Sequence, residues 1–253
     1  MMSDPLETKD WQGCDIECAS CAHKSLRAAG RCEPGHACVQ DRYAKRIDRF
    51  FSWNRGLASD YLDHPYFEAR AVGAKYADVF RLPPLVRDPD ETVRMTVALR
   101  LPERHLLALR EDPHREVRIR VASRLNGEDL APMRHDPDYY VRQIVARRLS
   151  PGMLVTMLDD PDPQVRIAVA RRIATEWLPR LASDPDGDVR LAAAGRMDEW
   201  QLAHLMHDAD WRVRYEAAAR LGAAHIAGLM EDPDPEVRRV ARQRLALSGA
   251  SAI

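Results

Sequence analysis

The sequence is poor in aromatic residues, in net charge and in long apolar runs, and each shortage excludes a class of protein. Only 6% of the 253 residues are aromatic while 30% are charged, which suits many small helical units better than one thick globular core. The formal net charge of −1 lacks the excess of positive charge that a general nucleic-acid binder carries. No apolar run approaches the roughly 18 residues needed to span a membrane.

The beginning of the chain, MMSDPLETKD, lacks the apolar stretch of a secretory signal. We therefore expect a cytoplasmic protein that does not associate with a membrane. Lysine is scarce as well, with four lysines among the 38 basic residues (Lys9, Lys24, Lys45 and Lys75). Arginine makes up the rest, and it is the residue that forms planar, bidentate and partly buried ion pairs. GC-rich coding would give the same bias.

Cysteine is absent from the last 215 residues, because all five cysteines fall between positions 14 and 38. In a cytoplasmic chain this clustering favours metal binding over disulfides or free thiols. The C-x3-C-x2-C spacing lets three thiolates converge from one short loop, and the turn at Pro34-Gly35 could bring a fourth around. The candidate ligands are four of the five cysteines: Cys14, Cys18, Cys21, Cys32 and Cys38.

The spacing leaves the metal open. Four thiolates are the ligands that an iron–sulfur cluster requires. Zinc accepts four cysteines, or three cysteines with His23 or His36. The spacing does not identify the fifth, unused cysteine, for which Cys14 and Cys32 are the leading candidates. Nearby cations would offset the charge of a thiolate-bound cluster, and three are available: Arg27, Arg31 and Arg42.

One unit of 24 residues repeats along most of the chain. Each unit has the same order of residues at fixed distances, as in Asp160, Val165, Arg166, Ala170 and Arg172. A degenerate first copy keeps the same register. The eight units begin near residues 64, 88, 112, 136, 160, 184, 208 and 232.

Each unit predicts one α-helix followed by a single short turn. Asp162-Pro163 and Asp234-Pro235 place an acidic N-cap before a proline at the first helical position. Apolar residues then recur at intervals of four, as in Val117, Val121 and Leu125. Because 24 residues cannot hold two full helices and two turns, we expect the second element to be one 3₁₀ turn. Stacked repeats would bury the apolar stripe that one repeat alone cannot bury.

The first arginine of each unit lies at the border of the packed face of the predicted helix. A partly buried guanidinium needs an acidic partner, and the recurrent aspartate is the obvious one. We therefore predict a ladder of Asp–Arg pairs that ties each repeat to the next and satisfies loop carbonyls. The alternative is an unpaired basic stripe that grips phosphates or an acidic partner.

The segment DRYAKRIDRFF after the cysteines predicts an amphipathic helix. Its apolar stripe comprises Tyr43, Ile47, Phe50 and Phe51. We interpret this helix as one that docks on and covers the exposed first repeat. A binding face for another protein is the alternative.

The chain resembles the leucine-rich repeat variant family. The resemblance rests on the unit DPDxxVRxxVAxRL…LxxL, from about residue 64 to 245, and on the segment CDIECASCAHKSLRAAGRCEPGHACVQDRYAKRIDRFF. It implies an all-α, right-handed superhelical solenoid that alternates α- and 3₁₀-helices. It also implies a four-iron four-sulfur cluster on the N-terminal cysteines, and so favours iron–sulfur over zinc. The resemblance implies no reaction.

We therefore predict a cysteine-rich cluster module with its docking helix in residues 1–52, and the repeat solenoid in residues 53–253. The function expected is a non-enzymatic scaffold for an unknown protein partner, with a [4Fe–4S] cluster that is structural or redox-sensing. The alternatives are a nucleic-acid-binding helical-repeat protein, which the low charge disfavours, and an electron-transfer protein. No residue is predicted to be catalytic, because the histidines occupy differing repeat positions without a nucleophile at a recognisable spacing.

Overall fold

The computed structural model describes residues 8–250, with side chains up to Leu247. The chain divides into two compact units, Met1–Leu125 and Asn126–Ile253, and each is described by itself. This division falls inside the repeat that begins near residue 112, between its helix and its short element. It does not coincide with the boundary predicted after residue 52, between the cysteine-rich module and the repeats, which stays a prediction.

Both units are helical, and the described residues contain only three isolated β-bridges, all in the cysteine-rich segment. The first unit contains α1 (Lys24–Ala28), α2 (Ala44–Trp53), η1 (Arg55–Tyr61), α3 (Phe67–Tyr76), η2 (Val79–Arg81), η3 (Pro83–Arg87), α4 (Glu91–Arg100), α5 (Glu103–Leu106), η4 (Leu107–Leu109) and α6 (Arg115–Ala122). The second contains α7 (Gly127–Leu130), η5 (Ala131–His135), α8 (Tyr139–Arg148), η6 (Pro151–Met157), α9 (Pro163–Ala170), η7 (Thr175–Trp177), α10 (Leu178–Leu181), α11 (Gly187–Ala194), α12 (Glu199–Leu202), η8 (Ala203–Leu205), α13 (Trp211–Arg220), α14 (Ala223–Ile226), η9 (Ala227–Leu229) and α15 (Pro235–Ala250).

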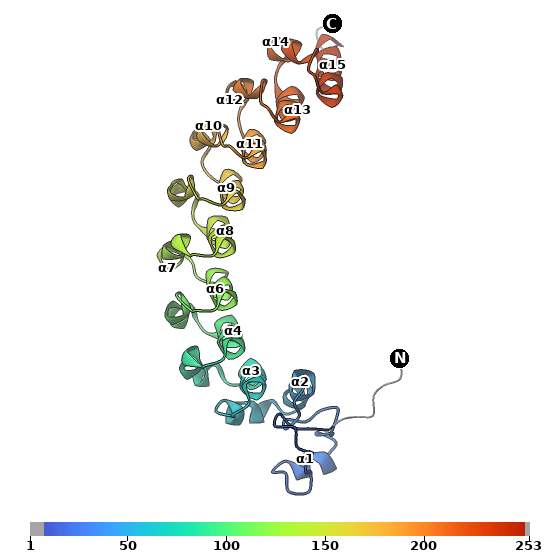
Figure 1. Ribbon diagram of the computed structural model, residues 1–253, viewed down its shortest axis with the longest axis vertical. Coiled ribbons are helices and arrows are strands. Elements are labelled where there is room, and N and C mark those ends of the chain that lie inside the picture. The colour runs from blue at the N-terminus through green and yellow to red at the C-terminus, as the bar shows by residue number, and fades with distance from the viewer. Residues whose placement is uncertain (1–7, 251–253) are drawn as a thin grey trace. The chain divides into compact units, whose positions relative to one another are not determined.

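Within each unit the longer helices form one row and the short turns form another (Figure 1). The prediction of an all-α solenoid with one helix and one short element per repeat is confirmed. The short element is longer than a single turn in several repeats. There a four-residue α turn adjoins the 3₁₀ turn, as α12 adjoins η8.

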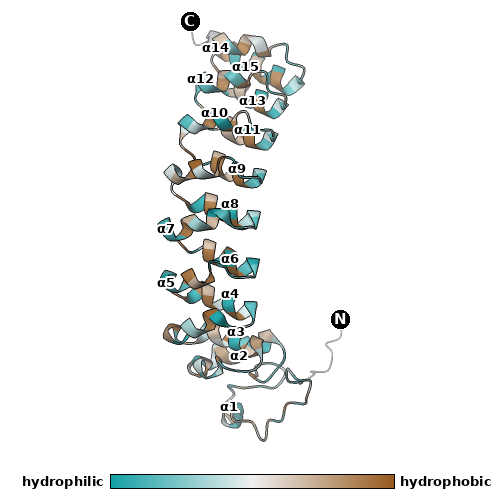
Figure 2. Cartoon of the chain, turned by 60° about the vertical axis from the view of Figure 1, so that its left-hand side comes forward, coloured by the Kyte–Doolittle hydropathy of each residue, from teal (hydrophilic) through white to brown (hydrophobic). Residues whose placement is uncertain are grey.

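The helices begin where the sequence predicts. The side chain of Asp162 accepts a hydrogen bond from the backbone N–H of Gln164 at 2.8 Å, and Pro163 is the first helical residue. The apolar stripe is buried as expected, since Val117, Val121 and Leu125 are fully inaccessible. Figure 2 shows hydrophobic residues where the two rows of each unit face each other. Neighbouring repeats therefore share one hydrophobic seam.

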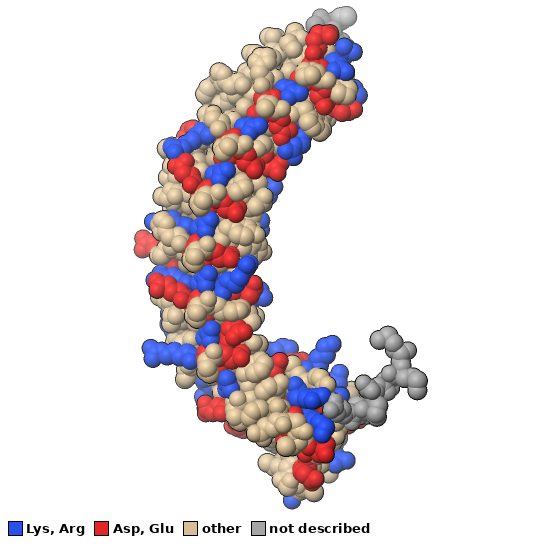
Figure 3. Space-filling model, in the orientation of Figure 1, with Lys and Arg blue, Asp and Glu red and all other residues tan. Residues whose placement is uncertain are grey.

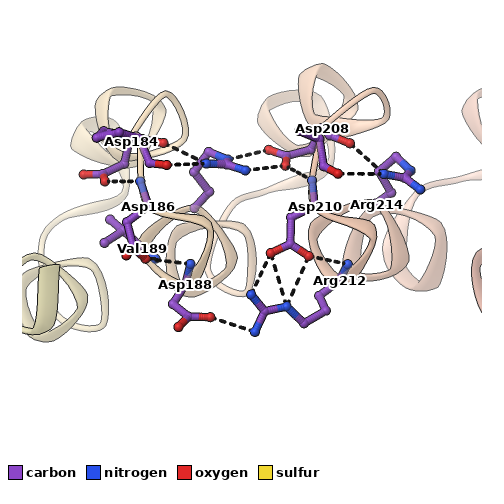
Figure 4. Close-up of polar contacts among 11 residues, drawn as sticks. Asp184, Asp186, Asp188, Val189, Asp208, Asp210, Arg212 and Arg214 are labelled. Carbon is purple, nitrogen blue, oxygen red and sulfur yellow. Dashed lines mark hydrogen bonds and ion pairs between the residues drawn. The ribbon is translucent and has the colours of Figure 1, made fainter.

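The ladder of arginine–aspartate pairs is present, and it joins consecutive repeats (Figure 4). Arg190 donates from Nε to Oδ2 and from Nη2 to Oδ1 of Asp208 in the next repeat, both at 2.8 Å. Asp208 in turn accepts the N–H of Asp210 on Oδ1 at 2.8 Å, and its carbonyl accepts from Arg214 Nη1 at 2.8 Å. The same bidentate pairing recurs within the two units: Arg70–Asp88, Arg94–Asp112, Arg142–Asp160, Arg166–Asp184, Arg190–Asp208 and Arg214–Asp232.

A second arginine series points the opposite way along the chain, and sequence reasoning assigned it no role. Arg196 donates from Nη1 to the carbonyls of Ala170 and Ile173, at 2.8 and 2.6 Å. These carbonyls end the helix of the preceding repeat, where four backbone acceptors lack intrahelical partners and the helix dipole favours a cation. Equivalent bonds come from Arg100, Arg124, Arg172 and Arg220. A repeat such as the one that contains Arg190 and Arg196 is thus bonded forward by one arginine and backward by the other.

The ladder makes a stability prediction at low pH. Hydrogen bonds from Arg214 lower the pKa of Asp232, against the opposing effect of burial. At Asp208 burial raises the pKa, but the bonds from Arg190 and the N–H of Asp210 outweigh it. A carboxyl with a lowered folded-state pKa stabilises the fold above its unfolded pKa of about 3.9, and this contribution disappears as the pH falls through the folded pKa. We expect urea-unfolding midpoints, followed by circular dichroism, to fall steeply below about pH 4, by more than they change between pH 7 and 5. A loss already between pH 7 and 6 would contradict the carboxylates as its cause.

Candidate metal centre in the cysteine-rich module

Residues 8–36 of the cysteine-rich segment are held by backbone and ring contacts and have no core of their own. Isolated bridges join Lys9 to Asp15 and Asp10 to Asp41. Residues 8–36 contribute no buried hydrophobic side chain. The segment therefore folds without the apolar burial that stabilises the repeats.

The predicted turn between Cys32 and Cys38 is confirmed. Glu33 and Ala37 exchange both backbone hydrogen bonds, at 2.8 and 2.7 Å. Gly35 sits in the turn with φ of +73°, a conformation that other residues rarely adopt. The turn sends the chain back, so that Cys32 and Cys38 stand at its two ends.

Cys32 interacts with three other cysteines, which are Cys18, Cys21 and Cys38. Burial raises the pKa of the Cys32 thiol, and the charges of Cys21 and then Cys18 raise it further, while a hydrogen bond with Cys38 lowers it. Burial also raises the pKa of Cys38 to about 12, with contributions from Cys32 and Cys21 of the same sign. Cys14 is exposed, and its N–H donates to Oδ1 of Asp10 at 2.8 Å. Cys32 thus lies within electrostatic reach of Cys18, Cys21 and Cys38, whereas Cys14 has no such role.

This donor set fits a cationic metal centre. Thiols that are buried together disfavour one another's thiolate form, and metal coordination reverses this because it deprotonates a ligating thiol outright. All five cysteines are free thiols in the structure. Within residues 8–250, no three His, Cys, Asp or Glu side chains gather closely enough to hold a single metal ion.

The two histidines considered as zinc ligands have other partners. The Nε2 atom of His23 hydrogen-bonds to the hydroxyl of Tyr61, and burial lowers the pKa of His23. The Nδ1 atom of His36 lies 3.0 Å from Nη1 of Arg49, which also donates to the His36 carbonyl at 2.7 Å. Both imidazoles therefore connect the cysteine loops to neighbouring helices.

Of the three arginines expected beside the cysteines, Arg27 acts on one of them, because its charge lowers the pKa of Cys32. The other two have different partners. Arg31 donates to the carbonyl of Trp53 at 2.8 Å, and Arg42 donates to the hydroxyl of Tyr43 at 3.1 Å. The prediction of three charge-compensating arginines is supported for Arg27.

Helix α2 packs against α3 of the first repeat, as predicted, and its Ile47, Phe50 and Phe51 are fully buried. Tyr43 is the exception in the predicted stripe, since it is 44% exposed. It precedes α2 as the N-cap residue, and its ring packs under the guanidinium of Arg46 at 4.8 Å. An N-cap residue lies outside the helical periodicity, so the apolar stripe begins only at Ile47.

Two polar residues beside the cysteines, the buried Asn54 and the half-buried Tyr61, were not singled out from the sequence. Asn54 donates from Nδ2 to the carbonyls of Arg31 and Phe50, at 2.8 and 2.9 Å, which ties the loop before Cys32 to the end of α2. Burial raises the pKa of Tyr61, and Cys21 is the largest of the charges that raise it further. Nothing in the sequence around either residue distinguishes it from an ordinary linker.

None of the helices in the described part of the chain is both long and apolar enough to cross a membrane. Residues 8–60 match the family model described as the FeS4 cluster of leucine-rich repeat variant proteins, and residues 139–162 match the leucine-rich repeat variant model. The "Uncharacterized 27.7 kDa protein in nifB 3′ region" of Rhodobacter capsulatus is 48% identical over 104 residues. That match spans 41% of this chain and 42% of the relative.

A solved structure, described as a leucine-rich repeat variant with a novel repetitive protein structural motif, is similar over nearly the whole chain. Its sequence is 44% identical and its TM-score is 0.87. The match covers 91% of this chain and 99% of that one. The chain therefore belongs to the leucine-rich repeat variant family and carries that family's iron–sulfur module in residues 8–60.

Proposed function

We propose that this chain is a non-enzymatic, cytoplasmic scaffold for protein interaction, and that Cys18, Cys21, Cys32 and Cys38 hold a [4Fe–4S] cluster. The match of residues 8–60 to the FeS4 cluster model is the observation that carries the proposal. The interactions of Cys32 with Cys18, Cys21 and Cys38 support these four cysteines as the ligands. Cys14 is the unused cysteine, because its environment is exposed. A reducing compartment suits four thiols that must remain available to iron.

The cluster has a structural role in this proposal. Residues 8–36 lack a hydrophobic core of their own, and a segment of this kind is commonly stabilised by metal binding. Holding four cysteines at one inorganic centre would fix the two loops that precede α2. A redox-sensing role would follow if the centre were gained and lost with the redox state of the cell.

The repeats support a binding role rather than catalysis or nucleic-acid binding. Six arginines of the first series are engaged in bidentate pairs with aspartates, so these guanidinium groups are not presented to phosphates. Figure 3 shows basic and acidic side chains alternating over the visible face of each unit instead of forming one basic stripe. Repeat arrays of this type typically bind partners along an extended surface.

The test is affinity purification of the tagged chain from its native extract without oxygen, with iron, sulfide and zinc measured in the eluate. We expect about four irons and four sulfides per chain, together with a stoichiometric protein companion. One zinc per chain without sulfide would contradict the proposed cofactor. An eluate that holds the iron-loaded chain alone would contradict the scaffold role.

A further inference from the structure

A groove lies between α2, α3 and α4 and encloses about 860 Å³. Its apolar lining includes Ala71, Val72 and Leu99, and Leu99 is 56% exposed although it lies in the middle of a stacked helix row. The remaining lining is largely charged. An exposed aliphatic floor with charged sides is the surface that an amphipathic helix of a partner covers.

The charge of the groove is positive. Lys45, Arg49, Lys75 and Arg100 line it against two carboxylates, those of Asp48 and Glu68, which leaves an excess of two positive charges. Lys75 and Asp48 neutralise each other through a 2.7 Å ion pair.

The excess positive charge of the groove lies on α2. Arg100 faces backbone carbonyls, as the other arginines of its series do. Lys45 is exposed, and Arg49 follows it by one helical turn on the same side of α2. Arg49 is held by His36 and not by a carboxylate of the described residues. Two cations one turn apart therefore border the apolar floor.

We propose that this groove binds an acidic amphipathic helix of a partner protein. Its apolar side would cover Val72 and Leu99, and its carboxylates would meet Lys45 and Arg49. The inference rests on the proposed scaffold function and names the chemistry of its partner. A single-stranded nucleic acid fits less well, because the residues that line the groove include no aromatic side chain on which a base could stack.

Arg49 connects the groove to the metal centre. Its Nη1 atom holds both the carbonyl and the ring of His36, which lies in the turn between Cys32 and Cys38. Loss of the cluster would release this turn, and with it the position of Arg49. The occupied groove and the loaded cluster therefore favour each other, since one side chain serves both.

The test uses two synthetic helical peptides with the same leucine stripe, one with glutamates and one with lysines at its polar positions. Binding to the iron-loaded full chain is followed by fluorescence anisotropy without oxygen. We expect the glutamate peptide to bind at least about tenfold more tightly than the lysine peptide. Lys45→Glu should remove most of this preference. The matched control Lys24→Glu, an exposed lysine of the same module outside the groove, should preserve it.

Equal binding of the two peptides, no binding of the glutamate peptide, or a preference that survives Lys45→Glu would overturn the proposal. A different outcome is an oligonucleotide that displaces the peptide from the unmodified chain and binds the Lys45→Glu chain more weakly. That result would assign the groove to nucleic acid. Iron and sulfide are measured in every sample. Failure of an iron-loaded chain to bind thus counts against the groove, whereas absence of iron counts against the proposed cofactor. Chelator-treated chain should bind several-fold more weakly, and unchanged affinity would overturn the link through Arg49.

Discussion

Replacing Cys32 with serine should abolish cluster binding. We expect the iron content of anaerobically purified chain to fall from about four to below about one per chain, with parallel loss of sulfide. Cys32 interacts with Cys21, Cys18 and Cys38, so its removal takes one corner from the proposed ligand set. A serine hydroxyl deprotonates far less readily than a thiol and is a poor replacement for a soft thiolate ligand.

Cys14→Ser is the matched control, because it makes the same atomic change in the same segment at an exposed thiol. This variant should keep its full iron and sulfide content. The opposite result, with iron lost from Cys14→Ser and retained in Cys32→Ser, would place Cys14 among the ligands. Cys32 would then be the unused cysteine, and the proposed ligand set of Cys18, Cys21, Cys32 and Cys38 would be wrong.

Replacing Arg142 with alanine should destabilise the second unit by about 3–5 kcal/mol, measured as a loss in the free energy of unfolding in urea. Arg142 and Asp160 have side chains that are 11% and 5% exposed, and they form two hydrogen bonds of 2.8 and 2.9 Å. The substitution leaves the Asp160 carboxylate buried without its main cation. It also leaves the carbonyl of Asp136 without the bond from Arg142 Nη1.

The neighbouring Arg147→Ala is the control, since Arg147 is exposed on the same helix α8. Its effect should stay within about 0.5 kcal/mol, as for most surface substitutions. The double variant Arg142→Ala with Asp160→Ala should lose less than the sum of its two single variants, because it leaves no unpaired charge. Additive losses would show that the pair is not coupled. A loss below about 1 kcal/mol for Arg142→Ala would reduce the ladder to a by-product of repetition.

The sequence predicted the repeats well, because a fixed period exposes which positions share one environment. The N-cap aspartate recurs in most repeats, as in Asp162, and apolar residues such as Val117 and Val121 recur at helical spacing. The first arginine recurs at the border of the apolar stripe. The N-caps, the buried seam and the forward ladder all followed from these regularities. The physical reason is that each repeat contacts only its neighbours, so the sequence of one repeat contains nearly all the information about the fold of the array.

The cysteine module was predictable only in outline. Its chain path depends on non-repeating backbone contacts, so spacing alone did not separate Cys14 from Cys32. The structure separates them by exposure. Asn54 and Tyr61 lie beside the cysteines because the segment around η1 contacts the cysteine loops. A tertiary contact of this kind leaves no periodic signal in one sequence. The second arginine series recurred visibly, but its carbonyl partners belong to the preceding repeat, and carbonyls leave no trace in a sequence.

The opposed arginine bonds have a consequence for how such a chain can change length. Arg190 reaches forward to Asp208, and Arg196 reaches back to Ala170 and Ile173, so both bonds depend on neighbouring copies being 24 residues long. Inserting or deleting one residue would misalign a forward and a backward bond at once. Inserting or deleting a whole copy would recreate both. The molecule therefore tolerates lengthening or shortening by duplication or loss of complete 24-residue repeats.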